Sequence, residues 1–288
     1  MDGMYVGFHL CINAKSFSQY IIGAFTDFGG LSTAFQVFIK NPRGYATANI
    51  PNEEVKLTKE FVEKNGILLV SHAAYILNCA SKEKWDKKLM TAIDDIMTID
   101  SLGGIGSVFH VGKYLKLDVS EATDNMREFI VKVVSDTGKM GCKADFILET
   151  AAGQGTECLV DLKEFGKFFW SIDAETRKRV KVCIDTCHVF AAGYELSDEK
   201  SVKEFYELVN EHIGWENVAL IHLNNSKCPL GSRKDRHENL TEGLIGCDGL
   251  KLFAKMCHEM FIPLVTETPC SGEGRKQEMK MLNQWITK

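Results

Sequence analysis

The sequence predicts one (β/α)8 barrel, the TIM-barrel fold of the α/β class, spanning residues 1–288 as a single domain. A length of 288 residues suits one barrel of about 250 residues, although two ordinary domains would also fit. Eight short apolar segments rich in β-forming residues recur at intervals of 30–44 residues, and each interval can hold one helix with its two loops. No linker, low-complexity tract or internal repeat divides the chain, which favours the single barrel.

The expected strands and helices alternate along the chain. The predicted strands are 4–9, 34–40, 66–72, 106–110, 145–149, 181–185, 218–223 and 262–267. They lack long polar breaks, as is typical of parallel strands that are buried on both faces. The gaps carry helical patterns at 53–64, 82–102, 121–140, 159–169, 200–213, 250–260 and 274–285. This alternation of strand and helix predicts a parallel sheet closed into a barrel.

Composition excludes several classes of protein. Hydrophobic residues make up 45% of the chain and charged residues 25%, a globular balance rather than that of a disordered, collagenous or coiled-coil chain. The formal charge of −5 argues against a general nucleic-acid coat but says nothing about a local basic patch. No apolar stretch reaches the ~18 residues of a membrane span, and no targeting signal is visible. We therefore expect no membrane association and an intracellular location, in the cytoplasm, the nucleoid or a nucleus.

Ten cysteines are spread along the chain, and none of them forms a CxxC pair. Without a signal peptide, this dilution indicates reduced thiols rather than a disulfide framework. The nearest pair, Cys183 and Cys187, lies in a predicted strand and just beyond it. We interpret both as packing residues.

The functional groups of such a barrel lie at the carboxyl ends of its strands and in the loops that follow. Asp, Glu and His account for about one residue in six, yet they stand at or next to the end of seven of the eight predicted strands. In chain order these residues are His9, His72, His110, Glu149, Asp185, His222 and Glu267, and the second strand supplies none.

Each of these residues alone has an ordinary explanation, as a buried hydrogen-bonding histidine or as a carboxylate that caps a helix. With their neighbours they bring five imidazoles and four carboxylates to one barrel mouth, where desolvation and repulsion would be severe without cations. The candidate metal ligands are His72, His110, Glu149, Asp185, His188, His222, Asp235, His237 and Glu267.

Two local spacings indicate how these ligands divide. Asp235 and His237 lie on the same side of an extended backbone and can chelate one ion. Asp185 and His188 are separated by a turn, so we expect them to serve different ions. Nine groups allow three ions with at least three protein ligands each. Zinc is the expected metal for such His-rich sites, and manganese is a possible substitute.

Three divalent ions outweigh four carboxylates, so the centre would be net positive and suited to an anionic substrate. The surrounding loops add cations interleaved with tyrosines, namely Lys40, Arg43, Lys113, Lys116, Lys227, Arg233, Lys234 and Arg236, with Tyr45, Tyr75 and Tyr114. We interpret Lys116 and Lys234 as solvated charges. Arg43 and Arg236 lie beside a strand end or metal ligands, and we expect them to contact phosphate.

Three motifs resemble the signatures of the endonuclease IV family of apurinic/apyrimidinic (AP) endonucleases. They are residues 182–194 (VCIDTCHVFAAGY), His222-Leu-Asn followed by 231–237 (GSRKDRH), and Glu149 followed by 152–155 (AGQG). The motifs are long, occur in the family's order, and belong to a resemblance that runs from the first strand to Glu267.

The resemblance implies a (β/α)8 catalytic domain with three zinc ions. Such an enzyme hydrolyses DNA 5′ to an abasic site, leaving a 3′-hydroxyl and a 5′-deoxyribose phosphate, and we also expect 3′-end-trimming diesterase activity. By motif match the ligands form three groups: His72, His110 and Glu149; Glu149, Asp185, His222 and Glu267; and His188, Asp235 and His237. Glu149 would be the catalytic bridging ligand that positions the metal-bound hydroxide.

The resemblance also implies how DNA is held. The segment 40–43 resembles a loop that enters the duplex, and 72–75 resembles a loop whose tyrosine holds the gap opened by nucleotide extrusion. Arg43, Tyr75 and Arg236 are therefore the expected DNA contacts. The expected partner is double-stranded DNA with abasic sites, bound by a monomer.

Three positions depart from the family pattern. Residues 11–16 (CINAKS) replace a small-residue, Gly-Gly segment in the first DNA-contacting loop. Asn225 stands where Asp is usual, and Thr150 stands where Asn commonly follows the bridging Glu. We expect the last two positions to tune ligands without removing any.

Two other functions are compatible with parts of the pattern. A xylose-isomerase-like sugar isomerase or epimerase shares the barrel and binds metals at the same face, but needs neither Arg43 nor the loop 231–237. A damage-recognition protein without activity would not need a complete ligand set.

Overall fold

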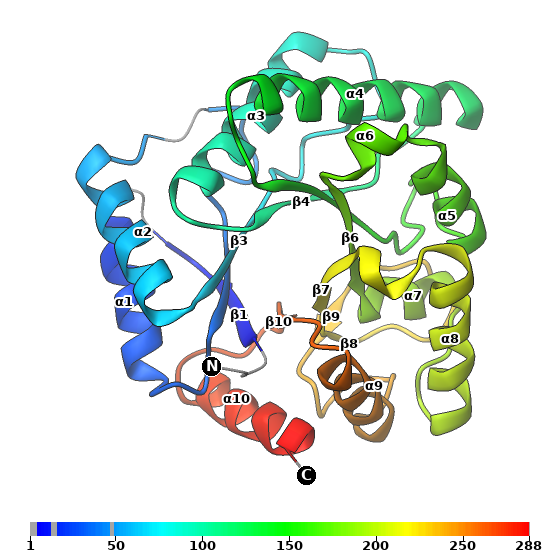
Figure 1. Ribbon diagram of the computed structural model, residues 1–288. Coiled ribbons are helices and arrows are strands. Elements are labelled where there is room, and N and C mark those ends of the chain that lie inside the picture. The colour runs from blue at the N-terminus through cyan, green and yellow to red at the C-terminus, as the bar shows by residue number, and fades with distance from the viewer. Residues whose placement is uncertain (1–4, 13–15, 47–48, 288) are drawn as a thin grey trace.

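The computed structural model describes residues 5–12, 16–46 and 49–287, and in these ranges eight parallel strands close into a barrel surrounded by helices (Figure 1). The barrel strands are β1 (Val6–Leu10), β2 (Ala34–Val37), β3 (Leu68–His72), β4 (Gly106–His110), β5 (Asp145–Glu149), β6 (Val180–Asp185), β7 (Val218–His222) and β10 (Leu264–Thr266). They follow one another around the ring in chain order, and β10 closes it against β1. The predicted (β/α)8 fold is confirmed.

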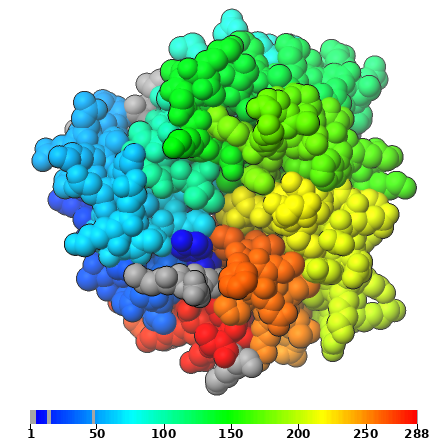
Figure 2. All heavy atoms as spheres, viewed as in Figure 1, coloured from blue at the N-terminus to red at the C-terminus, as the bar shows by residue number. Residues whose placement is uncertain are grey.

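The helices form the outer layer of the ring. They are α1 (Phe17–Asp27), α2 (Asn52–Asn65), α3 (Trp85–Ser101), α4 (Val119–Lys139), α5 (Leu162–Ser171), α6 (Ala174–Arg177), α7 (Thr186–Ala192), α8 (Glu199–His212), α9 (Cys247–Glu259) and α10 (Gly272–Thr287). A short antiparallel pair, β8 (Asn225–Ser226) and β9 (His237–Glu238), lies in the long segment after β7. In the space-filling view, the dark-blue start of the chain meets the orange segments of its last quarter near the middle of the face (Figure 2).

Two apolar clusters hold the barrel together. Side chains that point inward from successive strands, such as Val70, Val108 and Ile147, fill the barrel interior. A larger cluster lies between the sheet and the helices. Because the strands are buried on both faces, their sequences read as nearly continuous apolar runs. Gly7 is required where β1 meets β2, since a Cβ there would lie 1.5 Å from the carbonyl oxygen of Ala34.

The element boundaries differ from the prediction in three places that matter for the site. Strand β2 ends at Val37 rather than at residue 40, so residues 38–43 already belong to the following loop. Helix α7 begins directly after β6, with Asp185 as its N-cap. Helix α1 fills the gap between β1 and β2, where the sequence pattern named no helix.

Candidate metal centre

The structure brings all nine candidate ligands to the carboxyl end of the barrel. His72, His110, Glu149, Asp185 and His222 are the last residues of β3, β4, β5, β6 and β7. Glu267 follows β10 directly, His188 lies in the first turn of α7, and Asp235 and His237 come from the loop that ends in β9. Strand register adds to this convergence, because His110 lies opposite Glu149 and Asp185 lies opposite His222.

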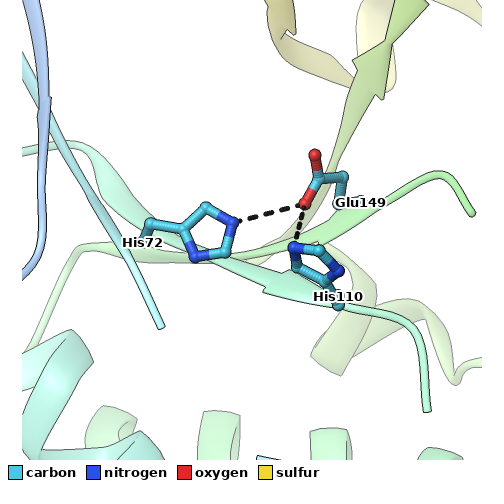
Figure 3. A group of neighbouring side chains, drawn as sticks. All are labelled: His72, His110 and Glu149. Carbon is cyan, nitrogen blue, oxygen red and sulfur yellow. Dashed lines mark ion pairs between the residues drawn. The ribbon is translucent and has the colours of Figure 1, made fainter. Parts of the chain in front are cut away.

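Glu149 is at the centre of the cluster and is 1% exposed. Its Oε2 atom lies 3.4 Å from Nε2 of His72 and 3.2 Å from Nε2 of His110. Figure 3 shows these two rings, which come from neighbouring strands, approaching the same carboxylate oxygen. The other oxygen, Oε1, lies 2.7 Å from Nδ1 of His222. Glu149 therefore faces two different groups of ligands with its two oxygens.

The remaining ligands extend the cluster away from Glu149. Nδ1 of His222 lies 3.4 Å from Oε2 of Glu267 and 3.8 Å from Oδ2 of Asp185. Nε2 of His237 lies 3.4 Å from Oδ2 of Asp185 and 3.1 Å from Oδ1 of Asp235. These contacts join the ligand groups into one continuous cluster.

The third expected group also comes together. Nε2 of His188 lies 3.4 Å from Oδ2 of Asp235, the carboxylate that His237 approaches from the other side. Arg236, between these two loop ligands, is exposed and directs its guanidinium to Oε1 of Gln154, 3.3 Å away.

The donor set fits divalent cations. His72, His110 and Glu149 offer three ligand atoms within 4.8 Å of one another, and so do Asp185, His188 and His237. A four-residue group meets the same limit, comprising Glu149, Asp185, His222 and Glu267. Among the residues that the structure describes, Oε2 of Glu149 and Nε2 of His237 are buried without a hydrogen-bond partner. Buried groups of this kind are stabilised by a cation.

Two cysteines lie close enough to join metal groups, Cys183 beside Glu149 and Cys187 beside Asp235. Both are fully buried, and burial raises the pKa of each thiol to about 12. Burial therefore favours the neutral thiol at both positions, as we expect for packing residues. All ten cysteines lie in the described ranges, and none of them forms a disulfide.

Neighbouring histidines and carboxylates shift the pKa values of one another in the cluster. Burial raises the pKa of Glu149, but His110 and His222 outweigh it and hold that pKa well below its usual range. Burial lowers the pKa of His237, but Asp185 and Asp235 outweigh it and raise that pKa to about 9. Because a metal ligand must be deprotonated, cations that bind here would displace such protons.

Backbone and side-chain partners fix the orientation of the ligands. Nδ1 of His188 contacts the carbonyl of Thr150 at 2.8 Å, which leaves Nε2 for Asp235. Asn224 donates from Nδ2 to Oδ2 of Asp185 at 2.8 Å and accepts the Glu267 backbone N–H at 2.7 Å. Partners of this kind hold metal ligands in place. Sequence reasoning quoted Asn224 within a motif but gave it no role.

The positions that depart from the family pattern lie around the ligands. Thr150 accepts the Asp185 backbone N–H through Oγ1 at 3.1 Å. Asn225 fastens the segment after β7 by accepting the Ile245 backbone N–H at 3.0 Å and donating to the Leu240 carbonyl at 2.8 Å. Of the third departure, residues 13–15 lie outside the described residues.

Sequence reasoning missed Gln36 altogether. The second strand was expected to end at Lys40 and to supply no functional group, but β2 ends at Val37 and carries Gln36 fully buried among the ligands. A polar amide in an otherwise apolar strand was the available signal.

A cavity of about 680 Å³ opens beside the cluster. It is lined by Arg43, Tyr75 and Arg236 together with His110, Asp235 and His237. Lys113 also lines it and lies 3.4 Å from Glu157. Lys40 is instead buried against helix α3, where it pairs with Asp94 at 2.8 Å, so it is not a surface cation.

A (β/α)8 barrel that gathers buried carboxylates and imidazoles at its strand ends defines a class of metal-dependent barrel enzymes. The profile of the xylose isomerase-like TIM barrel family matches residues 30–285. In the described ranges no helix has the length and apolar character needed to cross a bilayer.

Sequence comparison gives two informative relatives. A protein of Acanthamoeba polyphaga mimivirus named putative endonuclease 4 is 32% identical over 82% of this chain and 78% of its own length. Apurinic-apyrimidinic endonuclease 1 of Saccharomyces cerevisiae is 32% identical over 93% of this chain and 77% of its own length. Endonuclease IV from Thermus thermophilus superimposes with a TM-score of 0.85 at 28% identity, covering 98% of this chain and 99% of that one. The chain belongs to the endonuclease IV family.

Proposed function

We propose that this protein is a zinc-dependent AP endonuclease of DNA base-excision repair. It cleaves the phosphodiester 5′ to an abasic site in double-stranded DNA, leaving a 3′-hydroxyl and a 5′-deoxyribose phosphate, and it also trims blocked 3′ ends. Residues 1–288 act as one catalytic domain and as a monomer. Because the substrate is cellular DNA, the protein works in the cytoplasm, in the nucleoid or in a nucleus.

The observation that carries this proposal is the nine-residue cluster beside a cavity lined by Arg43, Tyr75 and Arg236. Three zinc ions, with manganese as a possible substitute, would be held by three groups of ligands: His72, His110 and Glu149; Glu149, Asp185, His222 and Glu267; and His188, Asp235 and His237. When bound, zinc would supply a nucleophile at neutral pH and electrostatic stabilisation of the charge that develops on phosphate.

The side chains of the protein perform the remaining tasks. Glu149 presents one oxygen to His72 and His110 and the other to His222, so it fixes the spacing between two ligand groups. The exposed guanidinium groups of Arg43 and Arg236 face the cavity and are suited to backbone phosphates.

Tyr75 is 58% exposed at the same cavity, and its backbone N–H donates to the carbonyl of Pro42 at 2.9 Å. This bond ties the loop after β3 to the loop that carries Arg43. An exposed ring in this position can fill the stack vacated by an extruded nucleotide, and extrusion costs least where no base is paired.

The matching family is described as a xylose isomerase-like TIM barrel, so a sugar isomerase or epimerase is the second candidate. Such an enzyme acts on a small neutral molecule and has no need of two exposed arginines at its cavity. A protein that only recognises damage would have no need of the complete ligand set.

The decisive experiment combines a metal count with a cleavage assay. Purified protein should carry about three zinc ions and should cut a duplex containing one abasic site, but not the same duplex with a base at that position. Prolonged chelation should abolish cleavage, and added zinc should restore it. One metal per chain with full activity after chelation would contradict the trinuclear centre, and isomerisation of sugars without cleavage of DNA would favour the second candidate.

A further inference from the structure

Gln36 is a fully buried amide on β2, and it contacts two of the proposed metal ligands. Its Oε1 lies 2.7 Å from Nε2 of His222, and its Nε2 lies 2.5 Å from Oε1 of Glu267. Its Nε2 also lies 2.9 Å from Nδ1 of His9, the residue opposite Gln36 across the β1–β2 pair. The amide thus uses both N–H groups and its carbonyl.

We propose that Gln36 is a positioning residue that presents Nδ1 of His222 and Oε2 of Glu267 to the zinc ion of their group. The inference rests on the proposed function, because it assigns Gln36 a task towards the metal that this function requires. It concerns how two ligands are oriented and does not require Gln36 to touch the ion.

The orientation of the amide follows from the chemistry of its neighbours. An ionised carboxylate can only accept hydrogen bonds, so the NH₂ group of Gln36 must face Glu267. The carbonyl oxygen of Gln36 must then face His222. Because that oxygen is only an acceptor, Nε2 of His222 must carry a proton and donate it.

This bond decides what the other nitrogen of His222 can do. With the proton of the neutral ring held on Nε2, the lone pair is on Nδ1, the form in which histidine binds a metal. Nδ1 points at Oε1 of Glu149 at 2.7 Å and at Oε2 of Glu267 at 3.4 Å. Without a cation, the contact between Nδ1 of His222 and Oε1 of Glu149 requires a second proton on the His222 ring. A cation bound among these atoms would take the place of that proton.

Gln36 also distinguishes the two oxygens of Glu267. Oε1 accepts the hydrogen bond from Gln36, whereas Oε2 faces Nδ1 of His222. The Glu267 backbone is held separately by Asn224 at 2.7 Å. The carboxylate is therefore fixed at its backbone and at one oxygen, and the other oxygen remains available to the metal.

An apolar side chain of similar size would fill the same space but remove this hydrogen-bond partner from three polar groups, on His222, Glu267 and His9. Loss of such supporting contacts weakens metal binding by about 10–100-fold. Gln36→Met tests this directly. Gln36→Glu keeps an acceptor for His222 but replaces the amide donor to Glu267 with a second carboxyl group.

The matched control is Asn125→Leu, which removes another buried amide, on α4, that donates to the carbonyl of Ala80 at 3.2 Å. Zinc affinity would be measured on the full-length protein by competition with a chelating dye. The proton on Nε2 of His222 would be followed by long-range ¹H–¹⁵N NMR on the zinc-loaded protein.

We expect Gln36→Met to lower the affinity for one of the three zinc ions by about 10–100-fold. The same variant should alter the NMR signals of the His222 ring. Gln36→Glu should lower the affinity for the same zinc ion but retain the Nε2–H signal of His222. Asn125→Leu should change neither the zinc affinity nor this signal. Unchanged affinity and unchanged His222 signals in both Gln36 variants would overturn the proposal, as would an equal loss of zinc in the control. These readouts need no DNA, so zinc-loaded protein that fails to cut abasic DNA would overturn the proposed function alone. Wild-type protein that binds no zinc would overturn both.

Discussion

Nζ of Lys40 lies 3.1 Å from Oδ1 of Asp95, and the two side chains are 4% and 1% exposed. Lys40 lies in the loop that carries Arg43, and Asp95 lies in the middle of helix α3. A second carboxylate, Asp94, accepts a hydrogen bond from the same ammonium at 2.8 Å. The pair fastens the base of a proposed DNA-contacting loop to the outer helical layer, so Lys40 does not offer its charge to phosphate.

Asp95 should make stability depend on pH. Burial and the neighbouring Asp94 outweigh Lys40 and raise the pKa of this carboxyl from 3.8 to about 7, so between these pH values the folded protein holds a proton that the unfolded chain releases. The stability that Asp95 contributes in this way is fully present below pH 4 and is lost as the pH rises to 7. The loss in the free energy of unfolding is on the order of 4 kcal/mol. The free energy of unfolding of Asp95→Asn, relative to wild type, should therefore increase over this range. Asp86→Asn, which changes an exposed carboxylate on the same helix, should follow the wild-type curve of unfolding free energy against pH. An Asp95→Asn curve that runs parallel to the wild-type curve would contradict the raised pKa of Asp95.

Glu149→Gln should reduce cleavage of abasic DNA by several orders of magnitude, because Glu149 contacts histidines of two ligand groups and its negative charge favours cations in both. The metal content of the purified variant should fall, while its circular dichroism stays that of the wild type. Glu199→Gln, which changes an exposed carboxylate at the start of helix α8, is the matched control and should leave both quantities unchanged. Rapid cleavage by a folded, metal-loaded Glu149→Gln variant would show that the bridging role is wrong.

Tyr75→Ala should weaken binding to abasic DNA more than binding to an intact duplex, since the ring is expected to fill the vacated stack. The exposed ring packs against Phe38 and His72, with centroids 5.3 and 5.5 Å away. Tyr75→Phe keeps these contacts and should retain most of the affinity. Both variants can be compared by fluorescence anisotropy on the two duplexes. Equal losses on the two DNAs would identify Tyr75 as a packing residue.

Arg43→Ala should weaken binding to abasic and intact duplexes alike, because phosphate contacts carry no information about the lesion. The slope of log affinity against log salt should become shallower by about one unit for this single arginine. Lys116→Ala, which removes an exposed charge that we interpret as solvated, should leave the slope unchanged. A salt series from low to physiological ionic strength measures both slopes, and an unaltered slope for Arg43→Ala would exclude a phosphate contact.

Arg275→Met should destabilise the protein by about 3–5 kcal/mol, because it leaves the buried carboxylate of Glu278 unpaired. Arg275 also donates to the hydroxyls of Thr266 and Thr268, at 2.7 Å each, on both sides of Glu267. The double variant Arg275→Met with Glu278→Met removes both charges and should recover part of the loss. Urea unfolding of the three proteins measures these differences, and a double variant less stable than the single one would contradict the buried-pair account.

The sequence alone determined the barrel and most of its functional face. The predicted boundaries at 106–110 and 145–149 coincide with β4 and β5, and both segments end in proposed ligands, His110 and Glu149. The prediction of these strand ends succeeded because a parallel strand buried on both faces is a continuous apolar run. The polar residue that ends the run therefore marks the carboxyl end of the strand. The loop ligands His188 and Asp235 came from local spacing to Asp185 and His237 and from the family motifs, since loops lack such periodicity.

The tertiary structure decided which polar groups meet. Lys40 was grouped with the surface cations because nothing nearby in sequence indicates that Asp94 and Asp95, on a helix more than fifty positions away, would bury it. Gln36 was overlooked because its partners come from β7 and from the segment after β10. A strand's own sequence specifies which of its residues point into the barrel. The contacts across the barrel mouth depend on strand register and on closure of β10 against β1, which only the folded chain defines.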